Sequence, residues 1–291
     1  QWYPGHMTKA KRMMEENIKL IDLVIEIVDA RIPISSRNPD IDSLAVNKAR
    51  IILLNKSDLA DDKITNQWIN YFNENNIYCL KLNSRNNSGI KQVNGLIMTA
   101  CADKIERNKQ RGILNRPIRA MVVGIPNVGK STFINSYAGK ASAKTGNKPG
   151  VTKGKQWIKL NKNVELLDTP GILWPKFDNQ EVGKRLAMIG SMNDEILNVE
   201  ELAIDTIKNI YSEYSDNVIE RYGLDKEKTA ASYDENAINP DNSVALYIME
   251  QAAVKRGCIK KGNNIDYEKI SNIILDDFRS GRLGRISLET P

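Results

Sequence analysis

Residues 124–131 (GIPNVGKS) place two glycines, a lysine and a serine at the spacing G-x-x-x-x-G-K-[ST]. Glycine lets backbone N–H groups turn inward around a phosphate chain, while the lysine can reach the β- and γ-phosphates and the serine can ligate Mg²⁺. The apolar run before this segment predicts a buried strand, and the run after it predicts a helix, whose N-terminus favours anions. This context predicts a nucleotide site. Its expected contacts are Asn127, Val128, Gly129, Lys130, Ser131 and Thr132, with Lys130 also stabilising the reaction and Ser131 binding the metal.

A second set of polar residues follows the apolar run at 51–54 and fits N-K-x-D. The carboxylate of Asp58 can accept hydrogen bonds from the N1–H and 2-amino groups of guanine, a pattern that adenine lacks. Asn55 is expected to brace the base edge, and the aliphatic stem of Lys56 to cover the ring face. Ser84 follows the next predicted strand and resembles the short loop whose backbone contacts the guanine O6. The sequence therefore favours GTP and GDP as ligands.

Two further segments are typical of the parts of such a site that respond to the γ-phosphate. Residues 168–171 fit D-x-x-G, so Asp168 is expected to hold Mg²⁺ through water and the Gly171 N–H to bond the γ-phosphate. Residues 139–156 contain five lysines, four glycines and no acidic residue, which predicts a loop. In that loop Thr152 is the candidate switch threonine, which completes the Mg²⁺ shell and supports catalysis, and Thr145 is its rival.

The order of these motifs predicts the fold. In an ordinary GTPase the phosphate loop comes first, whereas here N-K-x-D and the serine loop precede it. The same sheet forms from either order if the old termini are joined and the chain is reopened after D-x-x-G. We therefore predict an α/β fold, a circularly permuted P-loop GTPase domain with a mostly parallel sheet and helices on both faces.

The periodicity of apolar residues sets the expected elements and the domain boundary. We expect the permuted domain over residues 1–177, and an all-α domain over residues 178–291 because strand patterns end there. In the first domain we expect helices at 8–21, 62–75 and 89–111, and strands at 23–28, 51–54, 77–82, 118–123, 157–160 and 164–167. In the second we expect helices at 181–189, 199–211, 216–222, 244–256 and 267–278, with a long loop at 225–241.

The permutation determines which segment connects the two domains. The segment after Gly171 leads into the helical domain, so loss of the γ-phosphate could reorient that domain through a short tether. This coupling is a hypothesis that needs two demonstrated states.

Charge is divided unevenly along the 291 residues. Residues 1–175 hold 27 Lys and Arg against 15 Asp and Glu, whereas residues 176–291 hold 15 against 21. A basic nucleotide-binding half indicates a polyanionic partner, most simply nucleic acid, although ordinary solubility is the alternative. The acidic half contains two basic clusters, which serve RNA contact or only the stabilisation of helix C-termini. The clusters are Lys255, Arg256, Lys260 and Lys261, then Arg279, Arg282 and Arg285.

Composition indicates a cytoplasmic protein. Hydrophobic residues make up 41% and charged residues 27%, and no apolar run approaches the roughly 18 residues of a membrane helix. The three cysteines are scattered and form no metal-binding spacing, which favours a reducing compartment. We expect a monomer without a membrane partner.

Taken together, the motifs resemble those of the circularly permuted GTPases of ribosome assembly. The resemblance implies binding to a late precursor of the large ribosomal subunit, GTP hydrolysis stimulated by that particle, release afterwards, and an RNA-contacting helical domain. The net charge of the helical half fits RNA contact poorly unless its basic clusters provide it. The stretches that carry the resemblance are WYPGHM, DARIP, NKSD, GIPNVGKS, PGVTKG, DTPGILWP and FRSGRLGRISLE.

Catalysis raises a separate question because Ile172 stands where many GTPases place the glutamine that orients the attacking water. Intrinsic hydrolysis should therefore be slow. Asn127 matches the position that helps similar GTPases bind K⁺ near the phosphates. His6, the only histidine, is by its local sequence a turn residue, but the resemblance implies that it is the catalytic histidine.

Two other classes of function stay open at this point. One is a GTPase that acts on another RNA or ribonucleoprotein, such as a tRNA-modification or translation factor. The other is a small-molecule kinase, against which Asn55 and Asp58 argue because they are suited to guanine.

Overall fold

The computed structural model describes residues 12–114, 116–139, 156–159, 163–169, 179–192 and 198–291. The chain divides into two compact units, residues 1–180 together with 289–291, and residues 181–288. The sequence analysis placed the division at residue 177 and kept the C-terminal residues with the helices. In the structure, the last three residues belong to the first unit.

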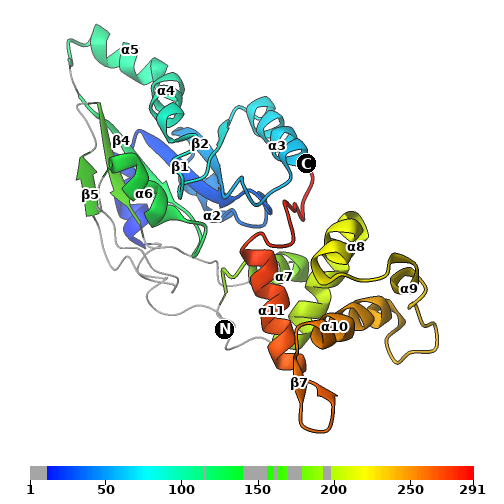
Figure 1. The fold of residues 1–291 in the computed structure, drawn as a ribbon. Coiled ribbons are helices and arrows are strands. Elements are labelled where there is room, and N and C mark those ends of the chain that lie inside the picture. The colour runs from blue at the N-terminus through cyan, green and yellow to red at the C-terminus, as the bar shows by residue number, and fades with distance from the viewer. Residues whose placement is uncertain (1–11, 115, 140–155, 160–162, 170–178, 193–197) are drawn as a thin grey trace. The chain divides into compact units, whose positions relative to one another are not determined.

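The first unit is built on a six-stranded sheet in the order β3-β2-β1-β4-β6-β5 (Figure 1). Neighbouring strands are parallel except at the β5–β6 pair, which is antiparallel. The mostly parallel sheet and the permuted order are thus confirmed. The strands are β1 (Leu23–Asp29), β2 (Ala49–Asn55), β3 (Tyr78–Lys81), β4 (Ile118–Val123), β5 (Gln156–Lys159) and β6 (Val164–Asp168).

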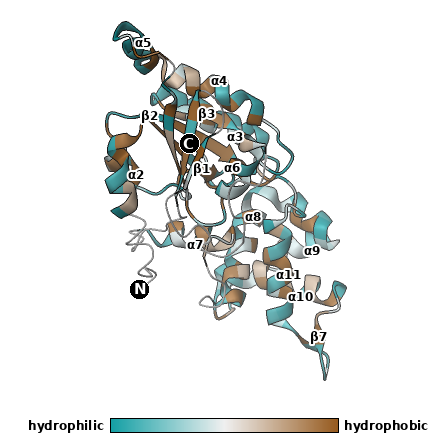
Figure 2. Ribbon diagram, turned by 90° about the vertical axis from the view of Figure 1, so that its left-hand side faces the viewer, coloured by the Kyte–Doolittle hydropathy of each residue, from teal (hydrophilic) through white to brown (hydrophobic). Residues whose placement is uncertain are grey.

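Helices cover both faces of this sheet, as predicted. The chain moves outward from β1 to β3 and then returns to β4, so right-handed crossovers place α2 and α3 on one face and α4 and α6 on the other. Contacts of α4 with both β2 and α6 agree with that placement. Because helices cover both faces of the sheet, the strands are apolar along their whole length, and Figure 2 colours them mainly brown. The helices are α2 (Asp40–Leu44), α3 (Asp62–Glu74), α4 (Ile90–Ala100), α5 (Ala102–Gln110) and α6 (Lys130–Ala138).

Parallel pairing brings the carboxyl ends of the central strands to one edge of the sheet. Asp29 is the register partner of Asn55, and Val122 is that of Asp168. The polar residues of the N-K-x-D, phosphate-loop and D-x-x-G motifs therefore collect at this edge, although the motifs occur in permuted order along the chain.

The helix expected at 89–111 is two helices, because Cys101 leaves the helical conformation (φ −104°, ψ 11°). Its thiol is buried, whereas the helix after it is strongly polar. The apolar pattern that buries one side of α4 thus ends at Cys101, and Asn108 is the one buried residue among the described residues of α5. At the other end of the unit, residues 12–17 of the helix expected at 8–21 are helical, and a 3₁₀ turn (Ile18–Leu20) follows them.

The second unit is helical, as predicted. The helices expected at 199–211 and 216–222 correspond to the two parts of α8, which is interrupted between them by a kink at Tyr214 (φ −128°, ψ 43°). The expected loop contains α9, and a small hairpin of β7 and β8 closes through Gly262 and Asn263, both at positive φ. Contacts among α8, α10 and α11 form the core. The bounds are α7 (Gln180–Met188), α8 (Val199–Tyr222), α9 (Lys226–Ala230), α10 (Ser243–Lys255), β7 (Ile259–Lys260), β8 (Asn264–Ile265) and α11 (Tyr267–Arg279).

Several cations of the two basic clusters have partners inside this unit. Asp277 is buried and accepts from Arg282 Nε (2.7 Å) as well as from Arg221 Nη2 (2.7 Å). Arg279 donates to the Ala187 and Met188 carbonyls at the end of α7 (2.8 and 3.0 Å). Arg279 therefore binds the C-terminus of α7, which is the alternative that the sequence left open, whereas Arg282 neutralises a buried carboxylate.

The C-terminal residues fasten onto the first unit through Glu289, whose carboxylate accepts from the Ile34 N–H (2.8 Å), the Ser35 N–H (3.1 Å) and the Ser35 hydroxyl. Its carbonyl accepts from Trp68 Nε1 (3.1 Å). Glu289 is 8% exposed, so the loop N–H groups at residues 34 and 35 depend on this carboxylate for their hydrogen bonds.

We predict that Glu289→Ala lowers the free energy of unfolding by about 2 kcal/mol, because two backbone donors lose charge-assisted hydrogen bonds. Urea unfolding followed by tryptophan fluorescence measures this change. Thr290→Ala is the matched control, since Thr290 is the exposed neighbour of Glu289. Equal stability of the Glu289 and Thr290 variants would contradict the assigned contact.

Candidate nucleotide-binding site

The phosphate loop connects β4 to α6 and packs tightly against neighbouring strands. A Cβ at Gly124 would lie 2.9 Å from the Ile27 carbonyl oxygen, so a side chain there would collide with the backbone of β1. Asn127 (φ 64°) and Gly129 (φ 92°) adopt left-handed conformations, which direct backbone N–H groups inward and form an anion-binding concavity. The loop ends at the N-terminus of α6, whose partial positive charge also favours a phosphate.

Asn55 of N-K-x-D joins the phosphate loop to the Ser84 loop. Its Nδ2 donates to the Val128 carbonyl (2.8 Å), and its Oδ1 accepts from the Ser84 N–H (3.0 Å) and hydroxyl (2.9 Å). The side chain is 3% exposed, so both ends of the amide are committed within the protein. Sequence reasoning assigned Asn55 to the base edge; its contacts in the structure are with these two loops.

A close approach of Asn55 explains the second glycine of the phosphate loop. A Cβ at Gly129 would lie 2.3 Å from Asn55 Nδ2, which is closer than any real contact. Only glycine at this position accommodates both the left-handed backbone and the amide beside it. The link between the two motifs is a contact that sequence reasoning missed, and the pattern N-K-x-D does not reveal it.

The remaining base-reading candidates lie close to this junction. The Ser84 carbonyl accepts from the Ser136 hydroxyl of α6 (2.5 Å), which ties the serine loop to the helix that starts at Lys130. Asp58 is exposed, three residues after Asn55. Lys56 stands between them in a left-handed conformation (φ 58°).

Lys130 and Asp168 meet at the carboxyl ends of β4 and β6. The ammonium of Lys130 donates to the carboxylate of Asp168, and the two side chains are 6% and 0% exposed. Burial lowers the pKa of Lys130, which Asp168 partly opposes. Thr169 fixes the start of D-x-x-G because its hydroxyl donates to the Val122 carbonyl (2.8 Å). Ser131 and Thr132 follow in the first turn of α6, where both are half-buried.

Five residues that the sequence analysis named lie outside the described residues: His6, Thr145, Thr152, Gly171 and Ile172. Among the expected site residues that the structure does place, two sets of contacts join the motifs. Asn55 links the Ser84 loop to Val128 of the phosphate loop, and Lys130 of the same loop pairs with Asp168. Both sets of contacts lie at the carboxyl edge of the sheet.

Asp29 and Arg31 are neighbours of the site to which the sequence analysis gave no role. They belong to the DARIP segment at the end of β1, and both are buried (0% and 1% exposed). Asp29 contacts Lys56 (Oδ2–Nζ 3.1 Å) and thus reaches the N-K-x-D motif. The adjacent ends of two parallel strands could have indicated this contact, but only once the strand order was known.

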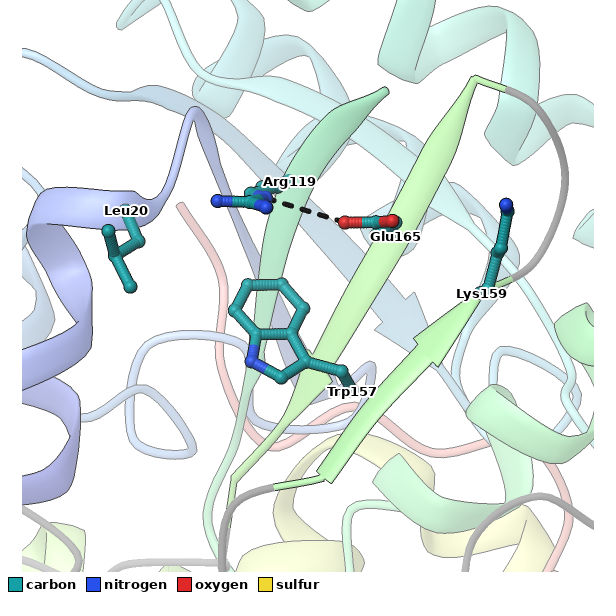
Figure 3. A pocket seen from close by; sticks show the side chains of 5 residues that line it. All are labelled: Leu20, Arg119, Trp157, Lys159 and Glu165. Atoms are coloured by element: carbon teal, nitrogen blue, oxygen red, sulfur yellow. Dashed lines mark hydrogen bonds and ion pairs between the residues drawn. The ribbon is translucent and has the colours of Figure 1, made fainter. Parts of the chain in front are cut away.

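A separate pocket of about 380 Å³ lies at the opposite edge of the sheet. Arg119 and Glu165 are near the amino ends of β4 and β6, and they form an ion pair (3.4 Å). Figure 3 shows the Trp157 ring beside Arg119, whose guanidinium carbon lies 5.5 Å from the ring centre. Leu20 and Lys159 complete the lining. This pocket is distinct from the nucleotide site because the phosphate loop follows the carboxyl end of β4.

The fold and this set of motifs define a P-loop GTPase whose motifs are circularly permuted. The family model described as 50S ribosome-binding GTPase matches residues 119–232. The chain is 46% identical to the ribosome biogenesis GTPase A of Bacillus cereus, covering 100% of this chain and 94% of that protein. It is 32% identical to the protein of that name from Thermotoga maritima, again covering 100% and 94%. The chain therefore belongs to the ribosome biogenesis GTPase A family.

Solved structures agree with this assignment. The GNP-bound structure of YlqF from T. maritima is similar with a TM-score of 0.62 and 26% identity, covering 97% of this chain and 98% of that one. The GDP-bound structure of TM YlqF has a TM-score of 0.65, 26% identity and coverage of 96% and 98%. The protein is thus an enzyme that binds guanine nucleotides and hydrolyses GTP. Among the helices that the structure describes, none has the length and apolar character that a membrane crossing requires.

We predict that Gly129→Ala lowers the affinity for GDP by about 100-fold, because the added methyl group displaces Asn55 by roughly an ångström. Calorimetric titration with GDP measures the loss. Gly139→Ala is the matched control: this glycine is also left-handed (φ 66°), but its Cβ would meet no described atom within 4 Å. GDP affinity of Gly129→Ala equal to that of Gly139→Ala would show that the contact with Asn55 is unimportant.

Proposed function

We propose that this protein is a GTP-driven assembly factor for the large ribosomal subunit, which binds a late precursor particle and is released after hydrolysis. The observation that carries the proposal is the similarity along the whole chain to the ribosome biogenesis GTPase A family, in a protein whose Asn55 amide joins the phosphate loop to the Ser84 loop. The description of the matching family model, 50S ribosome-binding GTPase, supports the large subunit as the target. We also propose that the protein acts in the cytoplasm as a monomer.

The guanine base is read by the N-K-x-D segment. The exposed carboxylate of Asp58 accepts from the N1–H and 2-amino groups, and the stem of Lys56 covers the ring. Asn55 contributes indirectly, since the polar atoms of its side chain form hydrogen bonds with Val128 and Ser84. The Ser84 loop is thereby held where its backbone reaches the guanine O6.

The phosphates and their metal would be held by the phosphate loop together with Asp168. Oxygen ligands suit Mg²⁺, and the residues next to Lys130 include a hydroxyl, on Ser131 in the chain, and a carboxylate, on its ion-pair partner Asp168, so the described residues fit this ion. Thr152 completes the set, and Gly171 contacts the γ-phosphate. Mg²⁺, when bound, neutralises the charge that develops on the β- and γ-phosphates. Lys130 adds a second, fixed positive charge.

Because Ile172 cannot orient water, two other groups supply the missing stabilisation. Asn127, whose backbone in the phosphate loop is left-handed (φ 64°), would help to bind K⁺ next to the phosphates, where the ion would add positive charge. His6 orients the attacking water once the ribosomal particle is bound. The particle thus acts as the trigger for hydrolysis.

RNA contact belongs mainly to the first unit. That unit contains the basic half of the sequence, and α5 with the residue after it presents the exposed side chains Arg107, Lys109 and Arg111. The helical unit uses Arg279 and Arg282 for its own packing, which reduces their availability for phosphates.

We predict that purified large ribosomal subunits or their precursors raise GTP turnover by about 100-fold, because a correctly positioned acid–base group typically accelerates a reaction by at least this factor. Phosphate release measures the rate, and small subunits serve as the control particle. His6→Ala should keep GDP affinity and lose the stimulated part. Undiminished stimulation in His6→Ala would remove His6 from the mechanism. Guanine-nucleotide binding without stimulation by any large-subunit particle would favour a GTPase of another RNA or ribonucleoprotein.

A further prediction concerns the monovalent cation. Hydrolysis should be about tenfold faster in KCl than in NaCl, because a cation beside the phosphates does part of the work of an arginine finger. Asn127→Gly removes the side chain but tolerates the left-handed backbone, and it should abolish the difference between the salts. Asn76→Gly is the matched control, since Asn76 is also left-handed (φ 59°) and lies at the turn before β3. A K⁺ effect that persists in Asn127→Gly would assign the cation to other residues.

A further inference from the structure

The carboxylate of Asp29 is the centre of a buried ion cluster at the end of β1. Its Oδ1 accepts from the Arg31 N–H (3.1 Å) and Nε (2.9 Å), and its Oδ2 accepts from Arg31 Nη2 (2.8 Å). The same Oδ2 lies 3.1 Å from Lys56 Nζ. The Asp29 N–H donates to the Ser36 hydroxyl (3.0 Å), which fixes the backbone from which this carboxylate projects.

Charge makes Asp29 the member on which the cluster depends. One carboxylate faces two cations, of which Arg31 is 1% exposed and Lys56 is 22% exposed. Burial opposes ionisation of Asp29, yet Arg31 and Lys56 outweigh it and hold the pKa of the carboxyl well below its ordinary value. Loss of Lys56 would leave Asp29 paired with Arg31, whereas loss of Asp29 would leave two cations next to each other.

Lys56 transmits this constraint to the base-reading carboxylate. Its backbone is left-handed, a conformation that residues with a side chain rarely adopt, and its carbonyl accepts from the Leu59 N–H (2.9 Å). Asp58 lies inside that turn. The Lys56 ammonium is thus tied to β1 while the Lys56 backbone begins the turn that carries Asp58, and the Ser57 N–H also joins this turn to the Leu82 carbonyl (3.2 Å).

We propose that Asp29 is a positioning residue for guanine recognition, which acts through Lys56 on the orientation of Asp58. It does not contact the nucleotide; it anchors the lysine of N-K-x-D from the neighbouring strand. This inference rests on the proposed reading of guanine by Asp58. It also assigns a role to Asp29, the acidic residue of the DARIP segment.

The test compares GDP with IDP, which lacks the 2-amino group that Asp58 is proposed to contact. Asp29→Asn should lower GDP affinity by about tenfold, the size of a typical coupling between contacting residues, and should bring the GDP-to-IDP affinity ratio toward one. Damage to the phosphate loop would weaken both nucleotides equally. Calorimetric titration of each nucleotide measures the ratio, and thermal unfolding verifies that the variant is folded.

Glu26→Gln is the matched control. Glu26 lies on the same strand, is 2% exposed, and has two cationic partners, Arg37 (3.0 Å) and Arg50 (3.6 Å). It has no part in the nucleotide site, so this variant should keep the wild-type ratio. If Asp29→Asn also keeps that ratio, the inference is wrong.

Lys56→Met tests the same route without unpairing Asp29, and so replaces Asp29→Asn if that variant does not fold. Lys56→Met should reduce the ratio as Asp29→Asn does, and the double variant should show no further reduction. A wild-type ratio in Lys56→Met would overturn the inference. A wild-type protein that binds GDP and IDP equally would instead overturn the proposed reading of guanine by Asp58, and this inference with it.

Discussion

The nucleotide site depends on one buried amide that must find partners for all its polar atoms. A buried carboxamide without hydrogen bonds destabilises the fold, so Asn55 is held where the Val128 carbonyl and the Ser84 N–H and hydroxyl satisfy it. These partners come from two loops that are distant from Asn55 along the chain. This side chain thereby joins the phosphate loop to the Ser84 loop, and its close approach requires glycine at position 129.

Buried carboxylates recur in this protein, and their partners give them different roles. Asp168 pairs with Lys130 of the phosphate-loop motif, and Asp29 pairs with Arg31 and with Lys56 of the N-K-x-D motif. In the helical unit, Asp277 pairs with arginines that hold helices together. The physical requirement is the same in each case, because a buried charge must be neutralised, but only the first two clusters include a residue of a nucleotide motif.

The permuted order changes how the two units are connected. The chain leaves the first unit soon after D-x-x-G, forms the helical unit, and returns at Glu289 to the loop at Ile34 and Ser35. The helical unit is therefore an insertion between two segments that belong to the GTPase unit. One of these segments follows the D-x-x-G motif, and the other packs on the loop that continues from DARIP.

The sequence by itself determined the fold class, the permutation and the helical second unit, because apolar runs and the order of the motifs can be read along the chain without knowledge of its contacts. It also predicted the residue types of the site, since Lys130, Asp168 and Asn55 stand in short motifs. Only the tertiary structure decided how those motifs are joined, which carboxylate anchors Lys56, and where the C-terminal tail packs. The physical reason is that hydrogen bonds and ion pairs between distant segments depend on strand order and register, which local patterns do not encode.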